Sequence, residues 1–489
     1  MKYPVESLRK SSKGKAMGRV NRIFLITFII VAIFLLSVCS KKKPPEPELP
    51  KYKWTILGYF DGNNSQDQAP DGGSYVLKDL DSLEQIDSTE EVQVLVMLGS
   101  AKTDGNCKYY HVKTDSSEVV DSLGNKDMSD PTSLRDFISY GVQNYPADHY
   151  MLIINDHGRG WKGICYDTIN GANNWMSLPD LSYAFSGFEF DIIWFYTPSM
   201  ATVEVAYQIM DRAQYMIASQ FKRYPDNIMG STEWLPYLTD NPNIDATSFA
   251  MKVTRAIYNA AQSISPYKHV HSVLIHLPKI AQVATNVSNL GQDLIDSTGS
   301  HWNEVWDVWK VSHSYDDCDS ASVHLREFAW KIHDQSNLNS AIKDAAKVLA
   351  TSIDDALLAE FMYPPYHEYT NLGGISIHFP WNQDLFDSTS YAQLDFVTTN
   401  WHSFISTFIQ SFSSNCAGTL NITSTPTGAK VFLNDVYTGY KTNAIISGIL
   451  PGSYTLRLSK EGYLDYVRLD FEIKPRVPTS WSATLDPIH

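Results

Sequence analysis

Residues 150–161 read YMLIINDHGRGW, an apolar run that ends in an aspartate, a histidine and two glycines. An unbroken apolar run of this length is typical of a strand buried on both faces of a parallel sheet. The glycines favour a turn in which backbone N–H groups can approach a ligand closely. We therefore expect a strand that ends at a cleft, with His157 as a candidate general base. A purely structural His-Gly turn is the alternative.

Similar apolar runs surround this one and alternate with helical patterns. Strands are expected at residues 54–60, 91–98, 191–195 and 216–219, and amphipathic helices at 74–87, 131–145 and 203–215. This alternation predicts an α/β fold with a mostly parallel sheet flanked by helices. In such folds the chemistry lies beyond the carboxyl ends of the strands.

A second strand end carries the sequence FYTPSMA at residues 195–201, followed by EVAY at 204–207. Together with IINDHGRGWKG, it resembles the clostripain family of cysteine peptidases, which has a caspase-like fold. In that family the histidine lies in an N-H-G-x-G-W segment and the cysteine in F-D-A-C-L-M-A, before a helix that opens with E-V-A-Y. LREFA at 325–329 and GISIHFP at 374–380 match later family segments. The resemblance therefore implies a caspase-like domain over residues 53–412.

The same resemblance assigns roles in the cleft. His157 takes the position of the family's base, and the N–H of Gly158 that of the oxyanion donor. Pro198 stands where the family has its cysteine. Because proline carries no nucleophile, the resemblance implies that catalysis has been lost.

Two other residues are candidate nucleophiles. Ser199 follows Pro198, but on an extended segment its side chain is expected to point away from His157. A serine also needs stronger activation by a base than a cysteine does. Cys165 lies eight residues after His157 and fits a small buried cysteine better than a nucleophile. An active hydrolase that uses Ser199 stays as an alternative.

The pocket that binds a basic side chain in the family is also altered. Tyr196 replaces an aspartate of that pocket, and Gln220 and Phe221 replace an acidic pair. The loss of three acidic groups predicts that the pocket no longer recognises arginine or lysine.

The N-terminal residues resemble an export signal. Residues 23–39 form an apolar stretch preceded by basic residues, and they end at Cys39 in a sequence similar to a bacterial lipobox. Val38 departs from the small residue usual before the lipidated cysteine. We expect a lipoprotein signal over 1–40 and a Pro-rich tether over 41–52; an uncleaved membrane anchor and a cleaved soluble form are the alternatives. All three place the rest of the chain outside the cytoplasm.

Composition narrows the function further. The formal net charge of −15 argues against nucleic-acid binding. No motif indicates a cofactor, and the five cysteines fit neither a zinc signature nor a dense disulfide framework. Two weak patterns could hold a metal: His269, His271 and His276, and an acidic turn at residues 316–319 that suggests calcium at most. The aromatic stripe of Trp302, Trp306 and Trp309 fits core or domain packing.

The pattern changes near residue 417 to short alternating strands, expected at 418–423, 429–433, 454–459 and 467–473. PTGA at 426–429, LPGSY at 450–454 and KEGY at 460–463 resemble the PEGA module of bacterial surface proteins. We expect a small all-β domain over 417–489 without a catalytic constellation, which suggests contact with a cell wall or surface.

The sequence thus favours a lipid-anchored bacterial envelope protein whose peptidase-like domain has lost catalysis and binds a peptide or protein in the old cleft. An active hydrolase and a purely structural envelope component are the two rivals.

Overall fold

The computed structural model describes residues 51–488, apart from gaps at 70, 172–173, 223–227, 264–269, 298–301, 313–320, 364–373, 382, 416–417, 450–451 and 475–477. The expected signal and tether, with Cys39, lie outside the described residues except for the last two tether residues, and so does the acidic turn at 316–319. Among the described residues, no helix is both long and apolar enough to cross a membrane.

A nine-stranded sheet forms the centre of the molecule, in the order β12-β10-β9-β8-β5-β1-β2-β3-β4. The five middle strands run parallel and the outer ones antiparallel. The strands are β1 (Tyr52–Gly62), β2 (Val92–Ser100), β3 (Asn106–His111), β4 (Glu118–Asn125), β5 (Ala147–Asn155), β8 (Phe190–Tyr196), β9 (Ala213–Ala218), β10 (Val270–His276) and β12 (Leu357–Tyr363). The expected mostly parallel sheet is confirmed.

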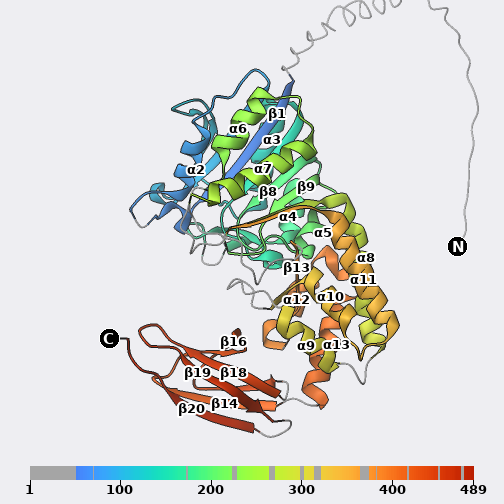
Figure 1. The fold of residues 1–489 in the computed structure, drawn as a ribbon. Helices are drawn as coiled ribbons and strands as arrows, with labels where there is room; N and C mark the ends of the chain where they lie inside the picture. Colours follow the sequence, from blue (N-terminus) through green and yellow to red (C-terminus); the bar gives the residue numbers. More distant parts are fainter. Residues whose placement is uncertain are drawn as a thin grey trace, which may run out of the picture. The chain divides into compact units, whose positions relative to one another are not determined.

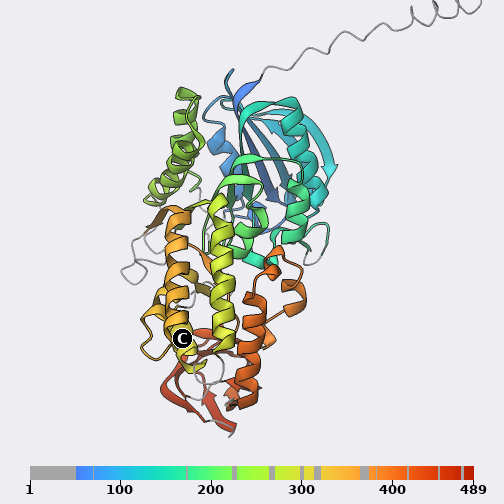
Figure 2. The same ribbon diagram turned by 90° about the vertical axis from the view of Figure 1, so that its right-hand side faces the viewer.

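Helices cover both faces of this sheet, which explains why its middle strands are apolar throughout. In β1, Trp54 and Ile56 face one hydrophobic core, whereas Leu57 and Tyr59 face the other. Figure 2 shows α6 and α7 on one side of the sheet and α3 on the other. The helices that pack on the sheet are α2 (Tyr75–Leu83), α6 (Ser231–Asp240) and α7 (Ala246–Ala261) on the first face and α3 (Pro131–Asn144), α4 (Leu178–Phe185) and α5 (Val203–Ile209) on the second.

Two of the expected helices are shorter than the apolar pattern predicts. The helix expected over 203–215 ends at Ile209, because Ala213 and Tyr215 pair with β8 as the first part of β9. The helix expected over 74–87 ends at Leu83. In both cases the apolar spacing of the helix continues into the residues that follow it, but these residues belong to a strand or a turn.

A second helical layer follows the sheet and joins it to the C-terminal strands (Figure 1). It contains α8 (Ile280–Asp296), α9 (Trp302–Ser312), α10 (Leu325–Asp334), α11 (Ser340–Ala356), α12 (Ser388–Tyr391) and α13 (Trp401–Asn415), with the short pair β11 (Ser322–His324) and β13 (Ser376–His378). The aromatic stripe on α9 is buried packing surface: the rings of Trp306 and Trp309 stack 4.9 Å apart, and Trp302 lies against Phe404 and Phe408.

The C-terminal residues form two small sheets, in the orders β17-β14-β20 and β16-β15-β18-β19. Their strands are β14 (Gly418–Thr425), β15 (Lys430–Leu433), β16 (Val436–Lys441), β17 (Ala444–Ile449), β18 (Gly452–Ser459), β19 (Tyr466–Ile473) and β20 (Pro478–Thr484). The expected β architecture is confirmed, with three strands more than the sequence indicated.

Candidate functional site

The two informative strand ends lie side by side. β5 and β8 are parallel neighbours with Asn155 opposite Tyr196, so the His157 turn meets the segment around Pro198. The contact is close: a Cβ atom added to Gly158 would lie 2.3 Å from the carbonyl oxygen of Pro198. Only a glycine fits there without moving one of the two backbones. The structure therefore brings together the residues that the sequence placed in the cleft.

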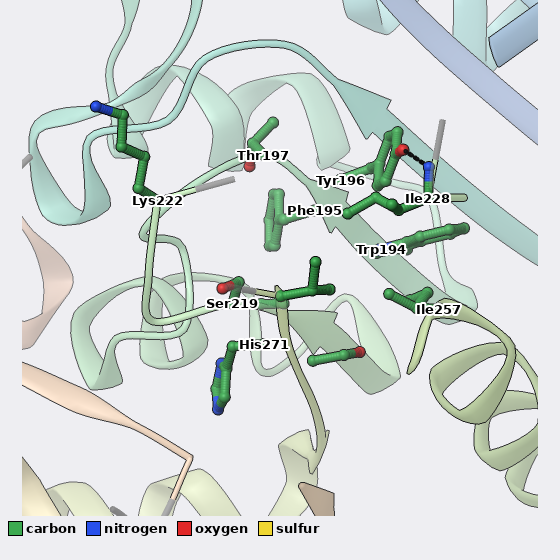
Figure 3. Close-up of a pocket in the computed structure, with 12 residues that line it drawn as sticks. Trp194, Phe195, Tyr196, Thr197, Ser219, Lys222, Ile228, Ile257 and His271 are labelled. Atoms are coloured by element: carbon green, nitrogen blue, oxygen red, sulfur yellow. Dashed lines mark hydrogen bonds between the residues drawn. The ribbon is translucent and has the colours of Figure 1, made fainter. Parts of the chain in front are cut away.

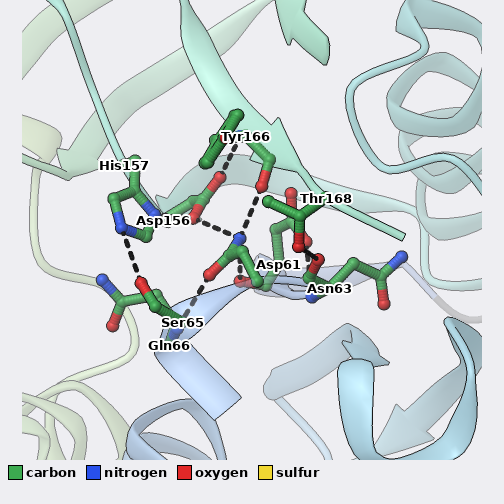
Figure 4. A network of polar contacts seen from close by, with 9 residues as sticks. Asp61, Asn63, Ser65, Gln66, Asp156, His157, Tyr166 and Thr168 are labelled. Carbon is green, nitrogen blue, oxygen red and sulfur yellow. Dashed lines mark hydrogen bonds and ion pairs between the residues drawn. The ribbon is translucent and has the colours of Figure 1, made fainter. Parts of the chain in front are cut away.

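The His157 ring is engaged on the opposite side, at the turn after β1. Its Nδ1 lies 2.7 Å from Oδ1 of Asp156, and its Nε2 lies 3.1 Å from Oγ of Ser65 (Figure 4). The sequence pattern around His157 predicted neither partner. A usable signal was present, because β1 and β5 are adjacent parallel strands and the residues that follow them must meet.

A buried carboxylate cluster supports this histidine. Asp156 is fully buried and accepts hydrogen bonds from the amide of Asn64, at 2.8 Å, and from the backbone N–H of Tyr166. Asp61 lies beside it, and burial, with the nearby Asp156 carboxylate as the second cause, raises the pKa of Asp61 well above its usual value. The cluster holds Asp156 in place behind the imidazole.

Figure 4 shows how the turn after β1 contributes to this network. Asn63 donates a hydrogen bond to Asp167 at 2.8 Å, and its carbonyl accepts one from the Thr168 hydroxyl at 2.9 Å. Within the described residues, no group of three ligating side chains fits a metal ion. The hydrogen bonds of Asn63 with Asp167 and Thr168 fix the turn.

The segment after Pro198 is not extended, which corrects the expectation for Ser199. Ser199 has a φ of 59°, in the left-handed region, so the alternation of an extended strand does not apply to it. It is also buried, with 6% exposure, and its N–H donates to the carbonyl of Phe221 at 3.2 Å. The N–H of Ala201 donates to Ser219 at 2.9 Å. Backbone pairing with the residues after β9 thus fixes this segment.

The described cysteines are buried thiols. Cys165 is completely buried, and burial, followed by the charge of Asp156, raises its pKa well above the usual value. Burial also raises the pKa of Cys107 to about 12. Because the thiolate is the nucleophilic form, neither side chain is activated at neutral pH. The reading of Cys165 as a small buried cysteine is confirmed.

A pocket opens at the carboxyl ends of β8 and β9 and the start of β10 (Figure 3). The empty space in and above it, open solvent at the mouth included, is about 350 Å³. Its lining residues are Trp194, Phe195, Tyr196, Thr197, Ala218, Ser219, Lys222, Ile228, Ile257, Val270, His271 and Ser272. No described lining residue is acidic, and Figure 3 shows the Lys222 side chain extending away from the others.

The three substituted positions lie in or next to this pocket. Tyr196 lines it, and its hydroxyl accepts a hydrogen bond from the N–H of Ile228 at 3.2 Å. Gln220 is buried and donates from its amide to Ser376 at 2.9 Å. The ring of Phe221 packs edge-on against His271. The phenol of Tyr196, the amide of Gln220 and the ring of Phe221 therefore fill this region without supplying negative charge.

His271 is a structural histidine in this arrangement. Its Nδ1 accepts from the N–H of Gln220 at 3.2 Å, and its Nε2 lies 3.1 Å from Glu360 on β12. His276 stacks on the ring of Tyr215. His269 lies outside the described residues. The described part of the predicted histidine set thus packs rather than converging on one point.

Comparisons with known proteins agree with this architecture. The clostripain family profile matches residues 59–474. Clostripain from Hathewaya histolytica is 23% identical over 342 residues, which cover 59% of this chain and 63% of that protein. The chain thus spans less than two thirds of that relative.

Two solved structures share the fold. An inactive zymogen C11 protease from Parabacteroides distasonis has a TM-score of 0.54 at 19% identity, over 71% of this chain and 98% of its own. A secreted C11 cysteine protease from Bacteroides thetaiotaomicron, solved with an irreversible peptide inhibitor, has a TM-score of 0.53 at 21% identity, over 72% of this chain and 99% of its own. The chain belongs to the clostripain family, peptidase C11.

Proposed function

We propose that this protein binds a peptide or a segment of another protein in the cleft of its clostripain-like domain and has lost thiol-dependent cleavage. The observation that carries the proposal is which side chains stand at the carboxyl ends of β5 and β8. Pro198 occupies the segment beside the His157 turn, while the imidazole is hydrogen-bonded to Asp156 and Ser65. A cysteine peptidase needs a thiolate next to its imidazole, and the two described cysteines are buried thiols.

The pocket at the end of β8 supports binding of a neutral side chain. Its walls are aromatic and aliphatic, and the acidic groups that would attract arginine or lysine are absent from the described lining. Thr197 and Ser272 line it with hydroxyl groups that are buried and have no hydrogen-bond partner among the described residues. Buried hydroxyl groups without a partner favour a ligand that can hydrogen-bond to them.

The location outside the cytoplasm is part of the same proposal. It rests on the export signal expected over residues 1–40 and on lipidation of Cys39, and a similar protein from Bacteroides thetaiotaomicron is described as secreted. Palmitate incorporation that depends on Cys39 would support the lipid anchor, and its absence would refute it. The C-terminal sheets would then lie on the cell surface, where a wall-binding role fits their resemblance to the PEGA module.

The test incubates the purified full-length chain with a diverse peptide library and measures cleavage and binding separately. We expect captured peptides and no cleavage products. Peptide cleavage that is lost in His157→Ala would overturn the inactive assignment in favour of a hydrolase. Failure to retain any peptide would instead favour a structural envelope component.

The two pocket hydroxyls allow a sharper version. The double change Thr197→Val and Ser272→Ala should weaken binding of a captured peptide by about tenfold, because two hydrogen bonds are lost. It should not lower thermal stability, since neither hydroxyl has a partner in the described protein. Ser352→Ala is the matched control: Ser352 is also buried, but its hydroxyl donates to Leu349 on α11. Equal binding by both variants would remove the pocket from the proposal.

A further inference from the structure

His157 sits between a hydroxyl and a carboxylate in the order found in serine hydrolases. Ser65 Oγ lies 3.1 Å from Nε2, and Asp156 Oδ1 lies 2.7 Å from Nδ1. In such a triad the carboxylate orients the imidazole, and the imidazole takes the proton of the serine. Figure 4 shows Ser65 and Asp156 on two sides of the His157 ring.

The position of Asp156 determines which ring nitrogen acts as the base. Asp156 is fully buried and is fixed by hydrogen bonds from Asn64 and Tyr166. In the neutral imidazole, a hydrogen bond donated from Nδ1 to this carboxylate places the proton on Nδ1. Nε2 then carries the lone pair and faces the hydroxyl of Ser65.

Ser65 is exposed to solvent, so a substrate can reach its hydroxyl group. It is the exposed first residue of a short 3-10 helix, Ser65–Asp67, and Asn64 caps that helix by accepting from the N–H of Gln66 at 2.8 Å. Asn64 therefore holds both the turn that carries Ser65 and the carboxylate that orients His157.

Ser65 lies on a different side of His157 from Pro198, the position where the family has its cysteine. β1 and β8 lie on opposite sides of β5, so Ser65 and Pro198 approach the His157 turn from opposite directions. The serine side does not depend on the lost thiol, on Ser199 or on the pocket at the end of β8.

We propose that Ser65, His157 and Asp156 form an acyl-transfer site that hydrolyses carboxylic esters. Ser65 Oγ bonds to the ester carbonyl carbon as its proton moves to His157 Nε2. The C–O bond then breaks, and the alcohol leaves with that proton. Water, activated by the same nitrogen, releases the carboxylic acid and restores the serine.

The local hydrogen bonds favour an ester over a peptide bond. The N–H of Gln66, the backbone donor next to Ser65, is already accepted by Asn64. Weak stabilisation of the oxyanion restricts a serine site to substrates with a good leaving group, and an alkoxide leaves more readily than an amide nitrogen. The inference therefore goes beyond the proposed peptide binding and stands independently of it.

The test treats the full-length chain with a fluorophosphonate probe and with p-nitrophenyl butyrate. We expect the probe on Ser65, located by mass spectrometry, and ester hydrolysis that falls by roughly a hundredfold or more in Ser65→Ala and Asp156→Asn. Ser122→Ala changes an exposed serine on β4 and should leave both signals unchanged.

Three results would overturn the proposal: no hydrolysis by the folded wild-type chain, a probe adduct on another serine, or unchanged hydrolysis in Ser65→Ala. These three results leave the proposed peptide binding untouched, because that binding is measured separately with the peptide library and the pocket variants. Conversely, a chain that captures no peptide would still hydrolyse the ester if the triad assignment is right.

Discussion

Asp61 is a single carboxyl group in surroundings that favour its protonated form. It is fully buried, and its Oδ1 accepts from the N–H of Asn63 at 2.9 Å. Burial and the neighbouring Asp156 carboxylate raise its pKa. A carboxyl whose pKa is raised by folding stabilises the native state at low pH, and this contribution is lost as the pH rises through the folded pKa.

Asp61→Asn should remove this pH dependence. The amide oxygen can still accept from Asn63, and the side chain stays neutral at every pH. We expect the melting temperature of the variant, relative to wild type, to increase between about pH 4 and about pH 8. Differential scanning calorimetry across that range measures it.

Asp71→Asn is the control with the opposite sign. Asp71 is exposed, and the hydrogen bond that it accepts from Lys78 lowers its pKa. Its small contribution to the stability of the folded state is therefore lost as the pH falls. Melting curves for Asp61→Asn and wild type that stay parallel with pH would contradict the prediction.

The sequence predicted the position of some site residues but not of others. His157 follows an apolar run and precedes glycines, so local pattern alone places it at a strand end. Ser65 lies 92 residues away and has no local mark of function. Its role depends on β1 and β5 being neighbours, which is a property of the topology. The φ of Ser199 likewise depends on pairing with residues after β9.

At the scale of elements, Glu204 links α5 to two segments that follow much later in the chain. Its Oε1 accepts from the N–H of His378 on β13 at 2.8 Å and from the hydroxyl of Tyr391 on α12 at 2.9 Å. Burial raises its pKa, and these hydrogen bonds oppose the increase. The link holds the helix after β8 against the second helical layer.

Tyr391→Phe should therefore destabilise the fold by about 1–3 kcal/mol, because it removes a donor from a buried carboxyl group. Urea denaturation followed by circular dichroism measures the loss. Tyr183→Phe makes the same chemical change on α4, where the side chain is 52% exposed, and should cost far less. Similar losses in both variants would count against a structural role for the Glu204 link.

Elements with an unbroken apolar core were predictable, and polar edge elements were not. β1, β2, β5 and β8 are buried on both faces, so composition alone marks them as strands. β4 is largely exposed and alternates irregularly, and β6 (Ile164–Asp167) and β7 (Asn174–Met176) form a short hairpin. Such strands form because an adjacent strand supplies their hydrogen bonds, and their own residues show no pattern that predicts them.

At the scale of the whole described chain, the second helical layer and the C-terminal sheets share an apolar cavity. Trp306, Trp309 and Trp381 line it from one side and Leu433, Val436, Ile449 and Tyr454 from the other. Tyr454 is buried, and burial raises its pKa. The two parts therefore stabilise one another through aromatic packing.

Val436→Asp should disrupt this packing, since it places an unpaired charge in the apolar contact. We expect a loss of about 3 kcal/mol or more, and a red shift of tryptophan emission as Trp306 meets solvent. Ile445→Asp, at a position of β17 that is 68% exposed, is the matched control. Unchanged emission in Val436→Asp would show that the two parts do not depend on each other.

The pairing of β14 with β20 has a consequence for the order in which the chain can fold. β14 opens the C-terminal sheets at residue 418, yet its parallel partner begins only at residue 478. Until β20 has been synthesised, one edge of β14 has no partner in this sheet. A chain stalled or cut before residue 478 would present this edge to other chains, where aggregation begins. The sheet around β14 is therefore complete only after β20 has been synthesised.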